Sequence, residues 1–220
     1  MAFDAMPQDT DSPGWRRLLT LIDEAAADGR EVFQPFTEMS FDERLKVVTL
    51  PPTIAKLTEV RRLVLYNTRL VRLPPEIGAM TNLEEFWPYQ SHRLRWFPYE
   101  VTRCLRLRDS SVSTRVLYGN FRNGSSFPHL SPVTTIDRPD RLDPAVRGVD
   151  AVRTCSVCDG PVNRELHQVW ISLRVATDVL PLLVNACSAT CVASLPQPAP
   201  GYLSTPHTGC PRLEPPGSFW

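Results

Sequence analysis

The sequence contains few lysines and no long apolar run. Lys46 and Lys56 are the only lysines, so arginine supplies nearly all of the 24 basic residues. There are also 24 acidic residues, so the formal net charge is zero and the chain as a whole has no electrostatic attraction for nucleic acids or anionic membranes. The longest apolar run, 179–184, contains Pro181 and is far shorter than the ~20 residues that a membrane-spanning helix requires. We therefore expect no membrane partner.

Segments that direct export and patterns typical of enzymes are also missing. The first residues lack the basic and apolar regions of a secretory signal, so we expect a cytoplasmic protein. The segment 119–126 has no phosphate-binding glycine spacing, and no serine lies in a G-x-S-x-G element. The histidines have no acid or nucleophile placed beside them in the sequence. The sequence therefore predicts that the protein is not an enzyme.

Four of the six cysteines form two closely spaced pairs in the last third of the chain. Cys155 and Cys158 are separated by two residues, and Cys187 and Cys191 by three. In a reducing compartment clustered cysteines favour metal binding over disulfides, and these spacings are typical of structural zinc sites. Gly160 would relax the backbone after the first pair. Two other interpretations remain open, namely a redox pair at the first two cysteines and four unmetallated core thiols.

The segment between the two pairs has the pattern of a hairpin. Alternating apolar residues over 169–175 indicate one strand, and 180–184 indicates a second. The second cysteine pair then falls at the start of a helix, where the helix dipole favours thiolates. A cysteine turn, a hairpin and a C-S-x-x-C helix start resemble the treble-clef zinc fingers. The resemblance implies one structural Zn²⁺ with four ligands: Cys155, Cys158, Cys187 and Cys191.

A repeat with a period of about 23 residues precedes the cysteine pairs. Leu50-Pro51, Leu73-Pro74 and Phe97-Pro98 recur at intervals of 23 and 24, each followed by an aliphatic residue and a short apolar segment. A unit of this length cannot bury its own apolar edge, so neighbouring units are expected to stack. The pattern resembles the leucine-rich repeat of the short L-P-x-x-I type, with a degenerate third unit.

Two short helices are predicted before the repeat. Ser12 and Pro13 begin an amphipathic helix that Gly29 ends, and Ser40 with Glu43 forms a capping box. Together the two resemblances imply an α+β fold, a short leucine-rich-repeat solenoid with an N-terminal helical cap, followed by a small treble-clef-like zinc module. The expected ranges are a helical cap at 1–46, repeats at 47–130, a linker at 131–152, a four-cysteine zinc-binding module at 153–195 and a proline-rich tail at 196–220.

The leucine-rich-repeat resemblance also places outward strand positions on a concave surface. Tyr66, Trp87 and Tyr89 would lie there, and exposed aromatic residues are characteristic of interface anchors. Alternatively, the N-terminal helices or the proline-rich tail bury them. The charged residues would form one row of alternating sign that can neutralise itself: Arg61, Glu84 and Arg108. We expect this face to bind a protein partner, without catalysis.

The alternative is nucleic-acid or regulatory-complex binding through the zinc module and the arginine-rich third repeat. Basic and aromatic residues alternate in the segment 92–108, an arrangement that can hold a nucleic-acid backbone and stack on bases. Two observations argue against nucleic acid as the partner. Trp96 and Phe97 fall at or beside core positions of the repeat, and the net charge of the chain is zero.

Overall fold

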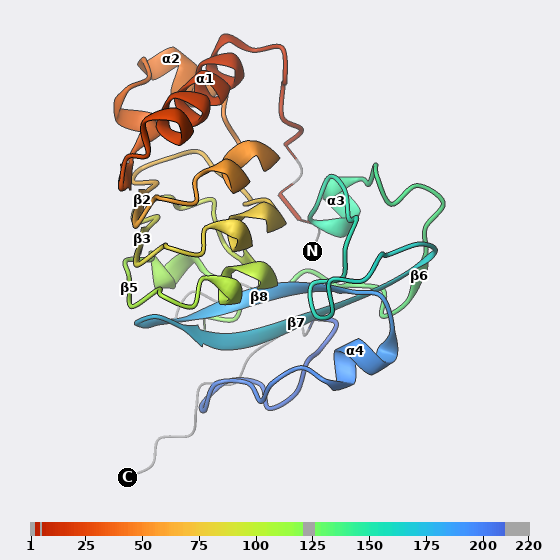
Figure 1. Cartoon of the computed structure of the whole chain (residues 1–220). Coiled ribbons are helices and arrows are strands. Elements are labelled where there is room, and N and C mark those ends of the chain that lie inside the picture. Colours follow the sequence, from red (N-terminus) through yellow and green to blue (C-terminus); the bar gives the residue numbers. More distant parts are fainter. Residues whose placement is uncertain (1–2, 5, 121–125, 210–220) are drawn as a thin grey trace.

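The structure is a computed structural model that describes residues 3–4, 6–120 and 126–209. These residues form an α/β fold with two four-stranded sheets (Figure 1). The first sheet is parallel throughout and has the order β1 (Val32–Phe33), β2 (Arg62–Val64), β3 (Glu85–Trp87) and β5 (Asp109–Ser110). The second has the order β4 (Phe97–Pro98), β8 (Asp178–Ala186), β7 (Glu165–Val175) and β6 (Thr134–Thr135).

The described residues contain four α-helices and five 3₁₀ helices. The α-helices are α1 (Pro13–Asp28), α2 (Phe41–Leu45), α3 (Pro144–Arg147) and α4 (Ala189–Ala193). The 3₁₀ helices are η1 (Pro35–Thr37), η2 (Pro52–Lys56), η3 (Pro75–Ala79), η4 (Tyr99–Arg103) and η5 (Thr114–Val116). None of the helices in these ranges has the length and apolar character needed to cross a membrane.

The predicted helix boundaries near the N-terminus are confirmed. The side chain of Ser12 accepts a hydrogen bond from the backbone N–H of Trp15 and begins α1, and Gly29 ends it in the left-handed conformation at φ 66°. Ser40 and Glu43 form both hydrogen bonds of the capping box at the start of α2. α1 buries one face, which includes Leu18 and Ile22, and packs against α2, η1 and η2.

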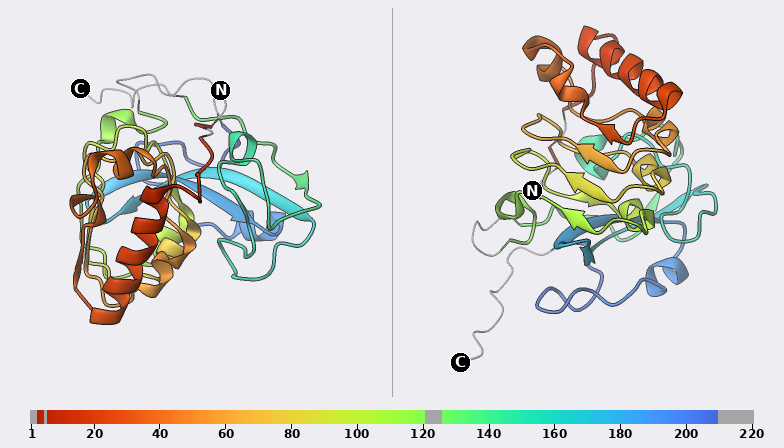
Figure 2. Two further views of the ribbon diagram at one scale, coloured as in Figure 1. Left: turned by 90° about the horizontal axis from the view of Figure 1, so that it is seen from above. Right: turned by 60° about the vertical axis from the view of Figure 1, so that its left-hand side comes forward.

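The first sheet has the spacing that the sequence repeat indicates. Arg62 pairs with Glu85, 23 residues later, and Glu85 pairs with Asp109, 24 residues later. Leu63 and Phe86, the middle residues of β2 and β3, are fully buried. Figures 1 and 2 show these strands in one layer and η2, η3 and η4 in a second layer beside them. The Leu-Pro elements therefore mark where the chain turns from a strand into the second layer.

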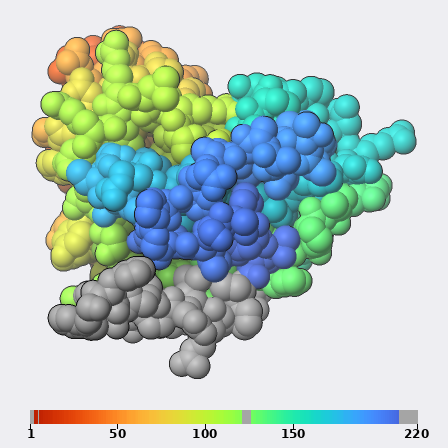
Figure 3. All heavy atoms as spheres, turned by 90° about the horizontal axis from the view of Figure 1, so that it is seen from below, coloured from red at the N-terminus to blue at the C-terminus, as the bar shows by residue number. Residues whose placement is uncertain are grey.

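A long hairpin of β7 and β8 covers the end of the first sheet. Phe97 and Pro98 in β4 pair in parallel with Leu182 and Leu183 in β8. At the turn of the hairpin, the hydroxyl of Ser110 in β5 donates to the carboxylate of Asp178 at 2.8 Å. Figure 3 shows that the chain between about 165 and 209 covers the middle of the lower face.

The fold class predicted from the sequence is wrong. A helix-capped leucine-rich-repeat solenoid followed by a treble-clef-like module was expected, whereas the described residues form an α/β fold with two small sheets, one of them all-parallel. The physical reason is a non-local pairing. Phe97 and Pro98, interpreted as the start of a third repeat, hydrogen-bond to the C-terminal hairpin and become part of the second sheet.

One hydrophobic core contains residues from both sheets. Trp170 in β7 is fully buried, and its indole N–H donates to the carbonyl of Pro128 at 2.9 Å. Four aromatic rings surround it with centroids 5.3–5.9 Å away: Phe3, Trp96, Tyr118 and Phe127. Because these rings come from distant parts of the chain, burying Trp170 joins the N-terminal residues to the C-terminal hairpin.

Candidate metal centre

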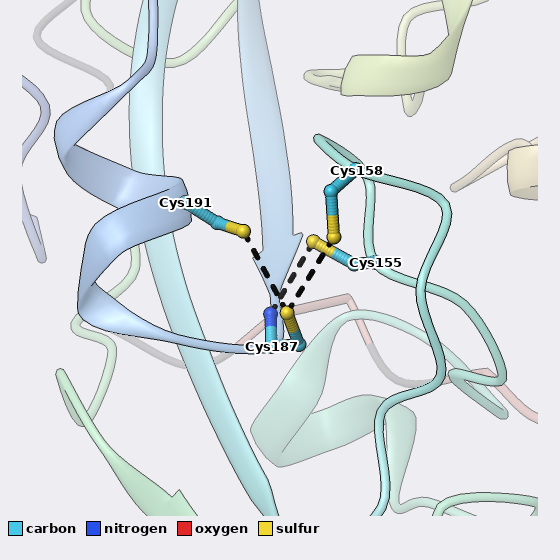
Figure 4. A group of neighbouring side chains, drawn as sticks. All are labelled: Cys155, Cys158, Cys187 and Cys191. Atoms are coloured by element: carbon cyan, nitrogen blue, oxygen red, sulfur yellow. Dashed lines mark hydrogen bonds between the residues drawn. The ribbon is translucent and has the colours of Figure 1, made fainter.

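The four predicted ligand cysteines lie together, as Figure 4 shows. Their sulfur atoms all lie within 4.8 Å of one another. The Sγ of Cys187 is 3.7 Å from that of Cys158 and 3.6 Å from that of Cys191. Four sulfurs bound to one ion at about 2.3 Å in a tetrahedron would be about 3.8 Å apart. The cluster therefore has the size required to hold one metal ion.

The first pair lies in a tight turn over residues 154–161. Thr154 forms an antiparallel bridge with Pro161, and the backbone N–H of Cys155 donates to the carbonyl of Gly160 at 2.7 Å. The left-handed residue of the turn is Asp159, at φ 59°. From the sequence, Gly160 was expected to provide the conformational freedom of this turn. A side chain at Gly160 would instead place its Cβ 3.2 Å from the Sγ of Cys158, so the glycine keeps space beside the sulfur.

The second pair lies where β8 leads into α4. Cys187 directly follows the strand, and Ser188 is the N-cap of the helix. The side chain of Ser188 accepts a hydrogen bond from the backbone N–H of Cys191 at 3.2 Å, which places Cys191 in the first turn. The hairpin fixes the end of β8, and the cap fixes the direction of α4. Together they point both sulfurs toward the turn that carries the first pair (Figure 4).

The four thiols affect one another's ionisation. Burial is the largest influence on Cys155 and opposes its ionisation, but backbone N–H groups of Cys158, Val157 and Cys187 lower its pKa to about 7. Burial, followed by the neighbouring sulfurs of Cys191, Cys158 and Cys155, raises the pKa of Cys187 to about 12. A bound cation would reverse this balance, because thiolates are its ligands.

The cysteine turn is fixed to the rest of the fold through Ser156. Its hydroxyl donates to Oε1 of Glu100 at 2.7 Å and accepts from the backbone N–H of Asn185 at 2.9 Å. Its carbonyl accepts from the guanidinium of Arg103 at 2.9 Å, and the same arginine pairs with Asp159. Ser156 and Glu100 were not predicted as site residues, since only the fold shows that they are in contact.

No disulfide joins the cysteines of the described residues. Cys104 is buried at the end of η4, as the repeat pattern predicts, and its thiol donates to the carbonyl of Ile77 at 3.4 Å. Burial raises the pKa of the Cys104 thiol to about 12, so it is a core residue and not a reactive one. Cys210 lies outside the described residues.

The aromatic residues predicted for a partner lie on the outward face of the first sheet and its adjoining loops. Tyr66 and Tyr89 are 50% and 46% exposed, and their rings stack with centroids 6.3 Å apart. Trp87 is half-buried beside them, and its indole N–H donates to Asp109 at 3.2 Å. The helices α1 and α2 do not bury the two tyrosines. Phe219 and Trp220, the aromatic end of the predicted tail, lie outside the described residues.

The predicted charge row forms ion pairs with itself. Glu84 lies 3.6 Å from Arg61 and 2.7 Å from Arg108. A second pair, between Arg62 and Glu85, was not predicted. The guanidinium of Arg62 donates two hydrogen bonds of 2.6 and 3.0 Å to Glu85 and lies 4.7 Å from the centre of the Trp87 ring. The charges on this face are therefore balanced locally.

The segment considered for nucleic-acid binding has a different arrangement. Trp96 and Phe97 are buried, so neither ring can stack on a base. Arg93 forms hydrogen bonds of 2.7–3.1 Å with the carboxylate of Asp4, and Arg103 pairs with Asp159. These two arginines are already neutralised by carboxylates within the chain.

No protein-family model matches this chain, and no curated protein matches it.

Proposed function

We propose that this chain is a non-enzymatic protein-binding protein that uses the outward face of the first sheet and is stabilised by a structural zinc ion. The observation that carries the proposal is the aromatic patch, defined as Tyr66, Trp87 and Tyr89. Tyrosine and tryptophan are enriched among the residues that dominate protein–protein binding energies. Two large exposed rings stacked on each other have no role in the core of this fold.

The backbone and neighbouring side chains hold the aromatic patch in place. Asn67 and Gln90 directly follow the two tyrosines and adopt left-handed conformations, at φ 52° and 61°. The backbone N–H of Asn67 donates to the carbonyl of Tyr89, and that of Gln90 donates to Ser113, both at 2.9 Å. A surface ordered before binding loses less entropy when a partner docks, which favours affinity.

The charges around the aromatic patch suit a protein partner better than a nucleic acid. Arg62 pairs with Glu85 beside the indole of Trp87, and Glu84 pairs with two arginines. A nucleic-acid site needs basic groups free to contact phosphates. A polar rim with satisfied ion pairs around an aromatic centre is instead typical of a protein interface.

Zinc is the metal that the four-cysteine cluster favours. Four thiolates in a tetrahedron are typical of Zn²⁺ or of iron–sulfur centres. The cluster joins one tight turn to a strand–helix junction, as structural zinc sites do. With Cys155, Cys158, Cys187 and Cys191 as ligands, the ion would have no open coordination position. It would thus stabilise the C-terminal part of the fold and not catalyse a reaction.

Affinity capture from the native lysate tests the binding role when variants are compared side by side. Tyr66→Ala with Tyr89→Ala should remove a protein that the unchanged chain captures. Tyr202→Ala is the matched control, because this tyrosine is also 46% exposed but lies outside the aromatic patch. Equal capture by all three chains would contradict the proposal, and so would a nucleic acid as the only captured molecule.

A further inference from the structure

A cleft of about 600 Å³ lies beside η2, η3 and η4, and no residue of the aromatic patch lines it. The start of η2, the length of η3, the N-terminal segment 7–10 and the segment 149–154 enclose it, and η4 contributes Glu100 and Arg103. Apolar side chains make up much of its wall, among them Trp15, Leu73 and Pro74. Its volume and mixed lining are those of small-molecule sites.

Glu100 has one carboxylate oxygen that is not used within the protein. The side chain is only 3% exposed, and its Oε1 accepts the hydrogen bond from Ser156. Its Oε2 is buried without a hydrogen-bond partner among the described residues. Buried polar atoms almost always have a partner, and an unpaired carboxylate oxygen is costly. A donor from outside the chain would remove that cost.

Two of the three arginines that line the cleft are engaged elsewhere. Arg72 donates to both oxygens of Asp150, at 2.9 and 2.8 Å, and to the carbonyl of Met6 at 3.0 Å. Arg103 is engaged by the cysteine turn, and Arg153 is exposed to solvent. No arginine of the described residues hydrogen-bonds to the free oxygen of Glu100.

A second carboxyl group lines the cleft. Glu76 in η3 also lines it and is less buried than Glu100. The two side chains belong to consecutive 3₁₀ helices, η3 and η4, which pack against each other. Burial raises the pKa of Glu100, so a ligand with positive charge and N–H donors that reaches its free oxygen would favour the ionised form of this carboxyl group.

We propose that this cleft binds a small organic cation, an ammonium or amidinium group attached to an apolar body. The cation donates a hydrogen bond to Oε2 of Glu100 and is attracted by Glu76, while the apolar body packs against Leu73 and Pro74. This site is separate from the aromatic patch. If the cleft binds no organic cation, the protein-binding proposal is unaffected.

The test compares two probes of similar shape on the full chain at neutral pH. 2-Phenylethylamine carries an ammonium group, and 2-phenylethanol replaces it with a neutral hydroxyl. Binding is followed by amide chemical shifts, with Gly78 and Val152 as reporters because both line the cleft. The amine should bind at least ~10-fold more tightly than the alcohol, since a charge-assisted hydrogen bond forms only with the amine.

Glu100→Gln should abolish that preference. Glu59→Gln is the matched control, because Glu59 is exposed and does not line the cleft; it should retain the preference. Equal binding of both probes, no shift at millimolar amine, or an unchanged preference in Glu100→Gln would each overturn the proposal. A thermal melt checks that this variant folds. If it does not fold, the comparison of the two probes on the unchanged chain decides.

Discussion

Ser156, which lies between two of the clustered cysteines, donates a 2.7 Å hydrogen bond to Glu100 in η4. One serine therefore connects the candidate metal centre to the cleft. The same hydroxyl accepts the backbone N–H of Asn185 in β8, so three separate parts of the chain meet at one oxygen. The cysteine turn is positioned by this contact as well as by any ion that it binds.

Replacing Ser156 by alanine should destabilise the fold. Both oxygens of Glu100 would then lack a side-chain donor, and the N–H of Asn185 would lose its acceptor. Each buried polar group left unpaired costs about 1–3 kcal/mol, so we expect a loss of about 2–4 kcal/mol in the free energy of unfolding. Urea denaturation measures it. Ser204→Ala, at an exposed serine, should change the same quantity by less than about 0.5 kcal/mol. Similar values for the two variants would contradict this role for Ser156.

Gly78 in η3 should not tolerate a side chain. A Cβ there would lie 2.7 Å from the carbonyl oxygen of Glu100 and 3.0 Å from its Cβ. Because the nearest atom belongs to the backbone, η3 and η4 would have to separate. We expect Gly78→Ala to lower the free energy of unfolding by about 1–3 kcal/mol. Gly201→Ala is the comparison variant at an exposed glycine. A Cβ there would meet no atom within 4 Å, although the φ of 84° at this position adds strain. A thermal midpoint for Gly78→Ala equal to that of the unchanged chain would show that the helices can separate at no cost.

Stability should fall in mild acid because of His207. Burial lowers the pKa of His207 to about 4, from an ordinary value of 6.5. Its Nδ1 accepts the backbone N–H of Gly209 at 3.1 Å, and its ring packs edge-on against Phe127 at 4.7 Å between centroids. The folded state therefore holds the neutral ring.

The direction of the pH effect follows from that lowered pKa. His207 takes up a proton near pH 6.5 in the unfolded chain and only near pH 4 in the folded chain. The contribution of its neutral ring to stability is therefore fully present above pH 6.5 and declines as the pH falls between these two values. We expect His207→Gln to reduce the loss between pH 7 and pH 5 by about 1–2 kcal/mol. Urea midpoints at the two pH values measure this loss. His129→Gln, at an exposed histidine, should leave it unchanged. An identical pH dependence in His207→Gln would rule out the assigned role.

The cysteine cluster could be predicted from sequence because the residues that position each cysteine pair lie close to it in the chain. The C-x-x-C spacing determines one turn, and the cap at Ser188 determines the first turn of α4, so each pair is positioned by its own neighbours. The alternating apolar residues of β7 and β8 indicate the hairpin that brings the pairs together. The prediction of a cluster therefore needed only one short-range pairing.

The fold class could not be predicted in the same way. Phe97 has the same apolar character whether it stacks on a repeat or pairs with Leu182, which lies 85 positions later. The hydrogen bond of Ser156 to Glu100 spans 56 positions, and no pattern in either segment indicates it. The charges beside Trp87 likewise depend on Arg62 and Asp109, which are adjacent only across the sheet.

Metal content of the purified chain, compared with that of a cysteine variant, tests the metal centre most directly. Elemental analysis should give about one zinc per chain. Cys187→Ser should lose the metal and unfold the C-terminal hairpin more easily, because structural zinc contributes directly to folding free energy. Cys104→Ala removes a buried cysteine outside the cluster and should keep the zinc. A folded, metal-free chain whose stability is unaffected by a chelator would contradict the account.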